Sequence, residues 1–217
     1  MKNFWIILSI SFMLLVANAN ADVRFGVSAA YTQVEADGTE TEGGEKNSAS
    51  VSNDVVIPSI FVELSGERFS LGLDYIPLDA DVSNKTKKRT DTETSVTGTT
   101  TQTSTSRTQQ AQAEISDHFT LYATMALTDT FYLKGGMAQF TLNTEESLGT
   151  GSKYGNVDVD GFVYGFGFTD GNSRLELAYT DYEDISVSSS VARTGVTTNN
   201  SISADLDTLS LKYSYAF

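Results

Sequence analysis

The residue types that carry out catalysis are scarce in this sequence. It has one histidine, His118, and no cysteine, which excludes a thiol nucleophile, a cysteine-based zinc site and a disulfide framework. A histidine works as a general base only when a partner orients it and a substrate can reach it. The adjacent Asp117 cannot be that partner, because neighbouring residues of a strand point to opposite faces. No Ser-His-Asp arrangement can be read, so we expect no enzymatic activity.

Carboxylates are the most abundant reactive groups. Asp plus Glu number 28 against 14 Lys plus Arg, which gives a formal net charge of −14 and a pI of about 4.3. This charge argues against a nucleic-acid partner, because phosphate contacts need Lys and Arg. Six aspartates stand where apolar segments give way to long polar connections. They are Asp54, Asp79, Asp117, Asp160, Asp181 and Asp207.

These six residues, which we call the aspartate collar, allow two interpretations. In the first, they mark the level at which the apolar part of each segment ends, because a carboxylate is stable only where water can solvate it. Their oxygens could in addition bind Ca²⁺ or Mg²⁺ weakly, since hard oxygen ligands suit hard cations. The sequence has no coordination loop with a defined ligand spacing, and no other cofactor is expected.

The first 21 of the 217 residues have the pattern of a secretory signal peptide. Lys2 supplies a positive start, Phe4 to Val16 form an apolar stretch of 13 residues, and Ala19-Asn20-Ala21 is an A-x-A cleavage site. The stretch is too short for a spanning helix. We therefore expect Sec-type export and a single mature domain, residues 22–217.

Alternation with a period of two runs through almost the whole mature domain, as strands require. In the last nine residues, Leu209, Leu211, Tyr213, Tyr215 and Phe217 alternate with smaller or polar residues. No helical period competes with this pattern. Eight such segments can be delimited. They are residues 23–36, 55–65, 68–82, 113–127, 131–145, 157–169, 173–187 and 203–217.

The connections between these segments are alternately short and long. Tight turns occupy residues 65–68, 128–130 and 169–172, and long polar segments lie near 37–54, 83–112, 146–156 and 188–202. Such alternation predicts an antiparallel up-and-down barrel with turns at one end and loops at the other. Each apolar band covers about nine residues, the length of a tilted strand that crosses a bilayer.

The opposite faces of the segments carry charge, and this decides which face is inside. A soluble barrel would turn the apolar face inward, whereas a membrane barrel turns it towards lipid. Aromatic residues stand at both ends of the apolar face, like the girdles of a membrane barrel, and the charges on the other face nearly balance. The predicted lumen charge network is Arg24, Glu63, Asp74, Lys134, Arg174, Glu176 and Lys212. The competing fold is a soluble periplasmic β-sandwich.

The chain resembles the small eight-stranded outer-membrane barrels of Gram-negative bacteria, the OmpA transmembrane domain, OmpX and the opacity proteins. The signal peptide, the eight segments and the terminal Tyr213, Tyr215 and Phe217 carry this resemblance. It implies an all-β transmembrane barrel in the outer membrane, with short periplasmic turns and long extracellular loops. It also implies that the C-terminal aromatics are the signal read by the barrel-assembly machinery. Unlike OmpA, the sequence shows no periplasmic domain after the barrel, so we do not expect peptidoglycan binding.

The lumen of an eight-stranded barrel is just wide enough for side chains to fill it. We expect Arg24 beside Glu63 and Glu176 beside Lys212, in a paired core that seals the barrel. The alternative is a polar pathway, which would make the protein a narrow porin or small-solute channel. His118 is interpreted as a further lumen residue.

The long connections are where function is expected. Residues 85–110 are rich in Thr and Ser, and either a projecting hairpin, with residues 93–96 facing 99–102, or a coil suits them. Projecting strand edges could pair with a foreign strand, a route to adhesion. One basic cluster, Lys85, Lys87, Lys88 and Arg89, is expected above the rim, where lipopolysaccharide phosphates lie. We thus expect a monomeric structural and surface-interaction protein with an unknown extracellular ligand.

Overall fold

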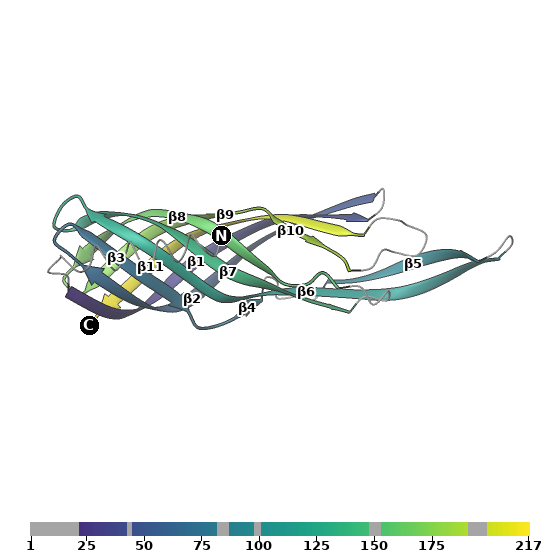
Figure 1. Cartoon of the computed structure of the whole chain (residues 1–217), viewed down its shortest axis with the longest axis horizontal. Coiled ribbons are helices and arrows are strands. Elements are labelled where there is room, and N and C mark those ends of the chain that lie inside the picture. Colours follow the sequence, from purple (N-terminus) through teal and green to yellow (C-terminus); the bar gives the residue numbers. More distant parts are fainter. Residues whose placement is uncertain (1–21, 43–44, 82–86, 98–100, 148–152, 191–198) are drawn as a thin grey trace.

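The computed structural model describes residues 22–42, 45–81, 87–97, 101–147, 153–190 and 199–217, and nearly all of them are in strands (Figure 1). The strands are β1 (Asp22–Glu42), β2 (Glu45–Ser65), β3 (Phe69–Ile76), β4 (Ala80–Asp81), β5 (Lys87–Thr97), β6 (Thr101–Ala126), β7 (Phe131–Ser147), β8 (Val157–Asp170), β9 (Ser173–Tyr182), β10 (Ile185–Ser188) and β11 (Ser201–Ala216). The predicted signal peptide, residues 1–21, lies outside the described residues.

Eight of these strands form a closed ring. Their order is β1-β2-β3-β6-β7-β8-β9-β11, and β11 pairs with β1 to close it, with every pairing antiparallel. Strands β4 and β5 pair with β6, and β10 pairs with β11. The predicted eight-stranded up-and-down barrel is therefore confirmed, and the β-sandwich is excluded.

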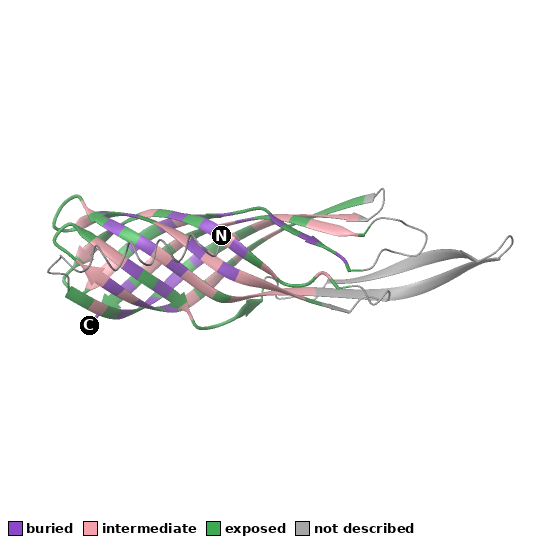
Figure 2. Cartoon of the chain, in the orientation of Figure 1, coloured by how far each residue is buried: buried purple, intermediate pink, exposed green. Residues whose placement is uncertain are grey.

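Buried and exposed residues alternate along the barrel strands, which gives the chequered surface in Figure 2. The apolar set faces outward: Phe25 is 60% exposed, Val56 71% and Phe217 74%. The charged residues Glu63, Asp74 and Lys134 are buried instead. The barrel is thus inverted relative to a soluble one, as the sequence predicts, because lipid rather than water surrounds its wall. Among the described residues there is no helix long and apolar enough to cross a membrane.

The strands differ from the predicted segments at their loop ends. β1 and β2 continue as a registered pair to Glu42 and Glu45, well beyond the predicted limits at residues 36 and 55. β5 and β6 also pair, from Lys87 with Ala111 to Thr97 with Thr101. The hairpin alternative for residues 85–110 is therefore the observed one, because Thr has a high strand propensity. The predicted register was wrong by three residues, since Val96 faces Gln102.

Two predicted segments are interrupted. Residues 68–82 were expected to form one strand, but β3 ends at Ile76, directly before Pro77, which has no N–H to donate to a ladder. Residues 173–187 are divided into β9 and β10 at the acidic pair Glu183-Asp184. Both interruptions lie towards the loop end, so the predicted strand count is unaffected.

An irregularity in β6 changes the face on which its side chains lie. The register with β7 shifts between Ser116 and Phe119, and Asp117 has a positive φ of 51°. Such a bulge re-aims the side chains on either side of it. Odd-numbered residues such as Leu121 face lipid below the bulge, whereas Ile115 above it packs against the interior. Asp117 is exposed and His118 lies inside, as predicted.

The lumen has two layers. The layer near the short turns holds the charged residues, with the buried rings of Phe61, Tyr122 and Tyr132. The layer nearer the loops is an apolar core, of which the sequence predicts Phe140 but not the full set. Its buried members are Ala138, Phe140, Val159, Val163, Ala178, Tyr182, Ile185 and Leu206. Part of the signal was available, because Val159 and Val163 are apolar residues at inward positions of segment 157–169. Ile185 could not be placed in this way, because the break at Glu183-Asp184 reverses the alternation and turns it inward.

Candidate functional site in the barrel lumen

Glu63 is the centre of the charged layer. It is completely buried, and its two carboxylate oxygens accept a bidentate pair of hydrogen bonds from the Arg174 guanidinium, at 2.5 and 2.6 Å. The Ser65 hydroxyl donates to the same carboxylate at 2.6 Å, and the Tyr122 hydroxyl donates at 3.0 Å. Such geometry is the strong form of an ion pair, because both partners are fixed and each oxygen is satisfied.

Two further ion pairs lie in the same layer. The Lys134 ammonium is 2.7 Å from Glu176, whose other oxygen accepts a hydrogen bond from Tyr132 at 3.1 Å. The Lys212 ammonium is 2.8 Å from Asp74. Lys134 also stands 4.3 Å from the centre of the Tyr122 ring, a cation–π contact. Three cations and three anions therefore neutralise one another inside the barrel.

These partners differ from the predicted ones. Arg24 and Glu63 are register neighbours, as are Lys212 and Glu176, so the predicted adjacency is correct. The predicted pairing was wrong, because Glu63 binds Arg174 and Glu176 binds Lys134. Long side chains reach across a narrow lumen more readily than they fold back along their own ladder. The described ion pairs join β2 to β9, β7 to β9 and β3 to β11, strands that are not neighbours in the ring.

The crossing ion pairs predict that the barrel does not conduct. Protein reconstituted into planar bilayers should give no stepwise current, because an ion would have to break buried, fully satisfied pairs. A known porin inserted into the same bilayers shows that channels can be detected. Large, reproducible conductance steps from this protein would contradict the sealed lumen and favour the alternative of a narrow channel.

His118 lies above the charged layer, beside the apolar core. Its Nε2 is 2.8 Å from the Tyr182 hydroxyl, and its ring is stacked with Phe140 at 6.2 Å between centroids. Its Nδ1 is buried and has no hydrogen-bond partner. The described contacts of this imidazole thus include no carboxylate that could orient it as a general base.

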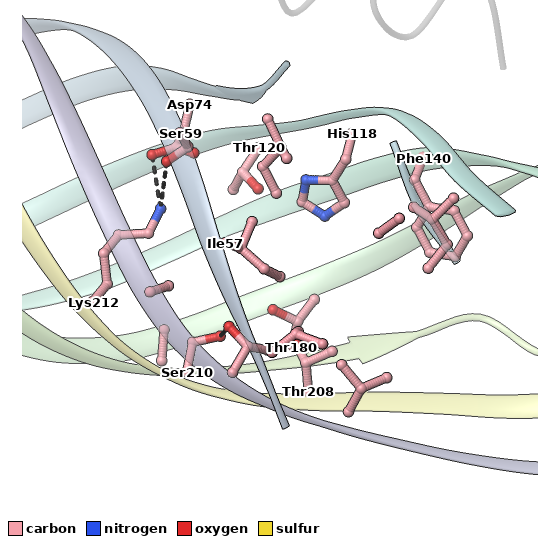
Figure 3. A pocket seen from close by; sticks show the side chains of 18 of the residues that line it. Ile57, Ser59, Asp74, His118, Thr120, Phe140, Thr180, Thr208, Ser210 and Lys212 are labelled. Atoms are coloured by element: carbon pink, nitrogen blue, oxygen red, sulfur yellow. Dashed lines mark hydrogen bonds and ion pairs between the residues drawn. The ribbon is translucent and has the colours of Figure 1, made fainter. Parts of the chain in front are cut away.

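A cavity of about 380 Å³ fills the lumen between these groups. Figure 3 shows His118 and Phe140 on one side of it, Ile57 in the middle, and Thr180 and Thr208 opposite. The ion pair between Asp74 and Lys212 lies at one end. The cavity is therefore lined by apolar and hydroxyl side chains, by the ion pairs Asp74–Lys212 and Lys134–Glu176, and by the exposed Asp79 and Asp81.

The aspartate collar is arranged as a boundary. Asp54, Asp79, Asp117 and Asp181 are exposed, and Asp160 and Asp207 are partly so. Tyr31 is a diagonal neighbour of Asp54, and Tyr179 is a diagonal neighbour of Asp207, so the collar lies directly above the upper aromatic girdle.

Carboxylates also meet above the collar, where a hydrogen bond to Asp184 raises the pKa of Asp205. No three Asp, Glu or His side chains of the described residues gather closely enough to bind a metal ion. A bound Ca²⁺ or Mg²⁺ would need oxygens from lipid phosphates as well, so the cation site stays a prediction.

The other predicted sites lie at the two ends of the barrel. Tyr213, Tyr215 and Phe217 face outward on the closing strand, and the Phe217 N–H donates to the Phe25 carbonyl at 2.7 Å. Their recognition by the assembly machinery stays a prediction. The structure does not describe the side chains of the four residues expected to contact lipopolysaccharide, so this contact stays a prediction. These residues are Lys85, Lys87, Lys88 and Arg89.

The closed antiparallel ring, the lipid-facing apolar band and the charged interior are together those of an outer-membrane barrel. No protein-family profile matches the sequence, and no curated protein is similar to it. Solved structures of similar fold include Ail, the attachment invasion locus protein of Yersinia pestis, with 11% identity over 90% of this chain and 99% of its own and a TM-score of 0.42. The outer membrane protease OmpT from Escherichia coli has 11% identity over 92% and 98%, with a TM-score of 0.44. The outer membrane protein AlkL has 11% over 89% and 90%, with a TM-score of 0.46.

Proposed function

We propose that this protein is a non-enzymatic surface protein of the outer membrane that binds extended polypeptide segments from outside the cell through strand edges above the bilayer. The observation that carries this proposal is the continuation of the strands past the aspartate collar. β1 and β2 remain paired from Gln33 with Asp54 up to Glu42 with Glu45. Figure 1 shows β5 and β6 projecting furthest from the barrel.

Two of these projecting strands, β2 and β5, have an open edge. Among the described strands, residues 45–59 of β2 pair with β1 alone, because the pairing with β3 begins at Ile60. Within the described part of the chain, β5 likewise pairs with β6 alone. An open edge presents a row of N–H and C=O groups that an extended peptide can pair with.

The composition of the open edge suits a reversible surface contact. Residues 46–54 of β2 are mostly Ser, Asn and small apolar residues. Side chains of this kind do not shield the backbone edge with charge or bulk, which is how natural proteins block edges that must not pair. The sealed lumen favours this surface role over a channel, and the barrel itself would anchor the strands and stabilise the membrane around it.

The proposal can be tested by blocking the edge. The probe is a phage-displayed library of random 12-residue peptides, selected on the purified protein in lipid nanodiscs. The variant Ser50→Lys with Ser52→Lys puts two charges on exposed positions of the open edge. We expect about tenfold fewer phage recovered from it than from the wild type, because lysine on an edge opposes strand addition.

The matched control carries the same added charge where no edge is open. Gln33→Lys with Ser203→Lys changes two exposed residues whose strands are paired on both sides. Gln33 of β1 lies between β2 and β11, and Ser203 of β11 lies between β1 and β10. This control should recover as many phage as the wild type. Equal losses from the two variants, or no selection by the wild type, would refute the proposal.

A further inference from the structure

The barrel wall parts between β2 and β3. Their register runs from Ser65 with Ser70 up to Ile60 with Tyr75, and β3 ends one residue later. The chain then joins β6 as the two-residue strand β4, while β2 continues alongside β1. Above Ile60 and Ile76, no described strand bridges the two sides of this opening.

Both prolines of the chain flank this opening. Pro58 lies on β2 two residues beyond the last pair with β3, and Pro77 follows the end of β3 directly. Proline has no N–H, so within a sheet it is confined to edges, strand starts and bulges. The two residues are therefore suited to a place in the wall where the ladder stops.

The lumen cavity reaches this opening. Its lining includes Ile57, which faces inward, but also Val56 and Pro58, which face outward from the same strand. Leu78 and Asp79 line it from the segment after β3 and are exposed. A cavity that touches both faces of β2 continues past the edge of that strand to the outer surface.

The outer mouth lies at the boundary of the apolar band. On β2 the lipid-facing Val56 is followed on the same face by Asp54 of the aspartate collar, and Asp79 stands at the same boundary on the other side. A molecule would therefore reach the mouth from the upper part of the outer leaflet, just below the headgroups. The carboxylates Asp79 and Asp81 in the lining oppose an anionic ligand.

The interior of the cavity defines the rest of the ligand. Phe140, Val163 and Leu206 give it apolar walls, whereas the Asp74–Lys212 ion pair is already satisfied within the protein. Among the fully buried side-chain atoms of the described lining, the His118 Nδ1 is the one that lacks a hydrogen-bond partner. A buried polar atom without a partner has lost its hydration without compensation, so a ligand that supplies a hydrogen bond there gains affinity.

We infer that the cavity is a binding site for an uncharged, mostly apolar molecule with a single hydrogen-bonding group, which enters sideways from the outer leaflet between β2 and β3 and bonds to His118 Nδ1. Its volume lies within the range of small-molecule pockets. The site is separate from the strand edges above the bilayer, so it does not depend on the surface function proposed for them.

The single histidine allows a direct test. Mature protein labelled with ¹⁵N-histidine in lipid nanodiscs gives the imidazole signals of His118 alone, and these are followed during titration with 1-decanol. We expect a saturable shift of Nδ1 that exceeds the shift of Nε2, which already bonds to Tyr182. Decane should shift Nδ1 little because it offers no hydrogen bond, and decanoate should bind at least tenfold more weakly because of its charge. An absent Nδ1 shift with 1-decanol, or an equal shift with decanoate, would overturn the inference.

The sideways route is tested with two matched variants. Val56→Asp places a charge at the mouth, and Leu209→Asp places one at the corresponding position on β11, one outward step below Asp207. Both residues are exposed and lipid-facing, but only Val56 lines the cavity. We expect about tenfold weaker binding of 1-decanol to Val56→Asp and unchanged binding to Leu209→Asp. Equal affinities of the two variants would overturn access through this opening.

Discussion

Replacing Glu63 with alanine will lower the free energy of unfolding by about 3–5 kcal/mol, because it leaves the Arg174 charge buried without its partner. The carboxylate is completely buried and accepts hydrogen bonds from Arg174, Ser65 and Tyr122. The loss of unfolding free energy is measured by urea titration of the protein in lipid vesicles. At each urea concentration, the folded fraction is read from the gel band whose mobility changes on heating.

A second substitution distinguishes loss of the ion pair from a general packing defect. Arg174→Met removes the unpaired charge and keeps the aliphatic length of the side chain. The double variant should therefore be more stable than Glu63→Ala alone, since neither partner is then left uncompensated. If the two losses simply add, the pair contributes no coupling and the view of the lumen as an ion-paired plug is wrong.

Gly136→Ala will destabilise the barrel by about 1–3 kcal/mol, whereas Gly135→Ala will change its stability by less than about 1 kcal/mol. A β-carbon on Gly136 would lie 2.5 Å from the Leu121 carbonyl oxygen and 2.9 Å from the Tyr122 Cα. Both are backbone atoms of β6, so relief requires the two strands to move apart. A β-carbon on Gly135 meets no atom within 4 Å, because that position faces lipid.

The same unfolding assay compares these adjacent variants, which differ only in the face that receives the methyl group. Assembly is a second measurement, as the fraction of protein that reaches the heat-modifiable folded form in the membrane. Similar stabilities of the two variants would mean that β6 and β7 can separate without cost at this point. That result would contradict the close approach seen between them.

The sequence predicts the barrel well because a period of two is a local signal. Strand existence, the face that meets lipid and the lumen position of residues such as Glu63 and Lys134 all follow from alternation. The end of β3 could also have been predicted, since Pro77 cannot continue a ladder. The bulge at Asp117 could not, because no residue type there requires a positive φ.

The ion-pair partners inside the lumen cannot be read from local alternation. Register neighbours such as Arg24 and Glu63 can be identified once strands are assigned, but the choice of Arg174 depends on reach across the ring. That reach is set by the barrel radius and by what else fills the interior, such as Tyr122. The cavity and the unpartnered His118 Nδ1 were equally hidden, because they depend on which side chains leave space rather than on which residues are present.

Strand β6 has a mechanical consequence for the proposed binding of a ligand outside the cell. It is a single strand from Thr101 to Ala126, with one bulge at Asp117, and at about 3.3 Å per residue it is roughly 85 Å of extended chain. A pull on its outer end is carried along the backbone directly to the periplasmic turn, with no loop in between to yield. Within the barrel the load becomes shear against β3 and β7, so that many ladder hydrogen bonds share it at once. The lower half of β6 is therefore held on both sides by ladder hydrogen bonds that resist a force applied to its outer end.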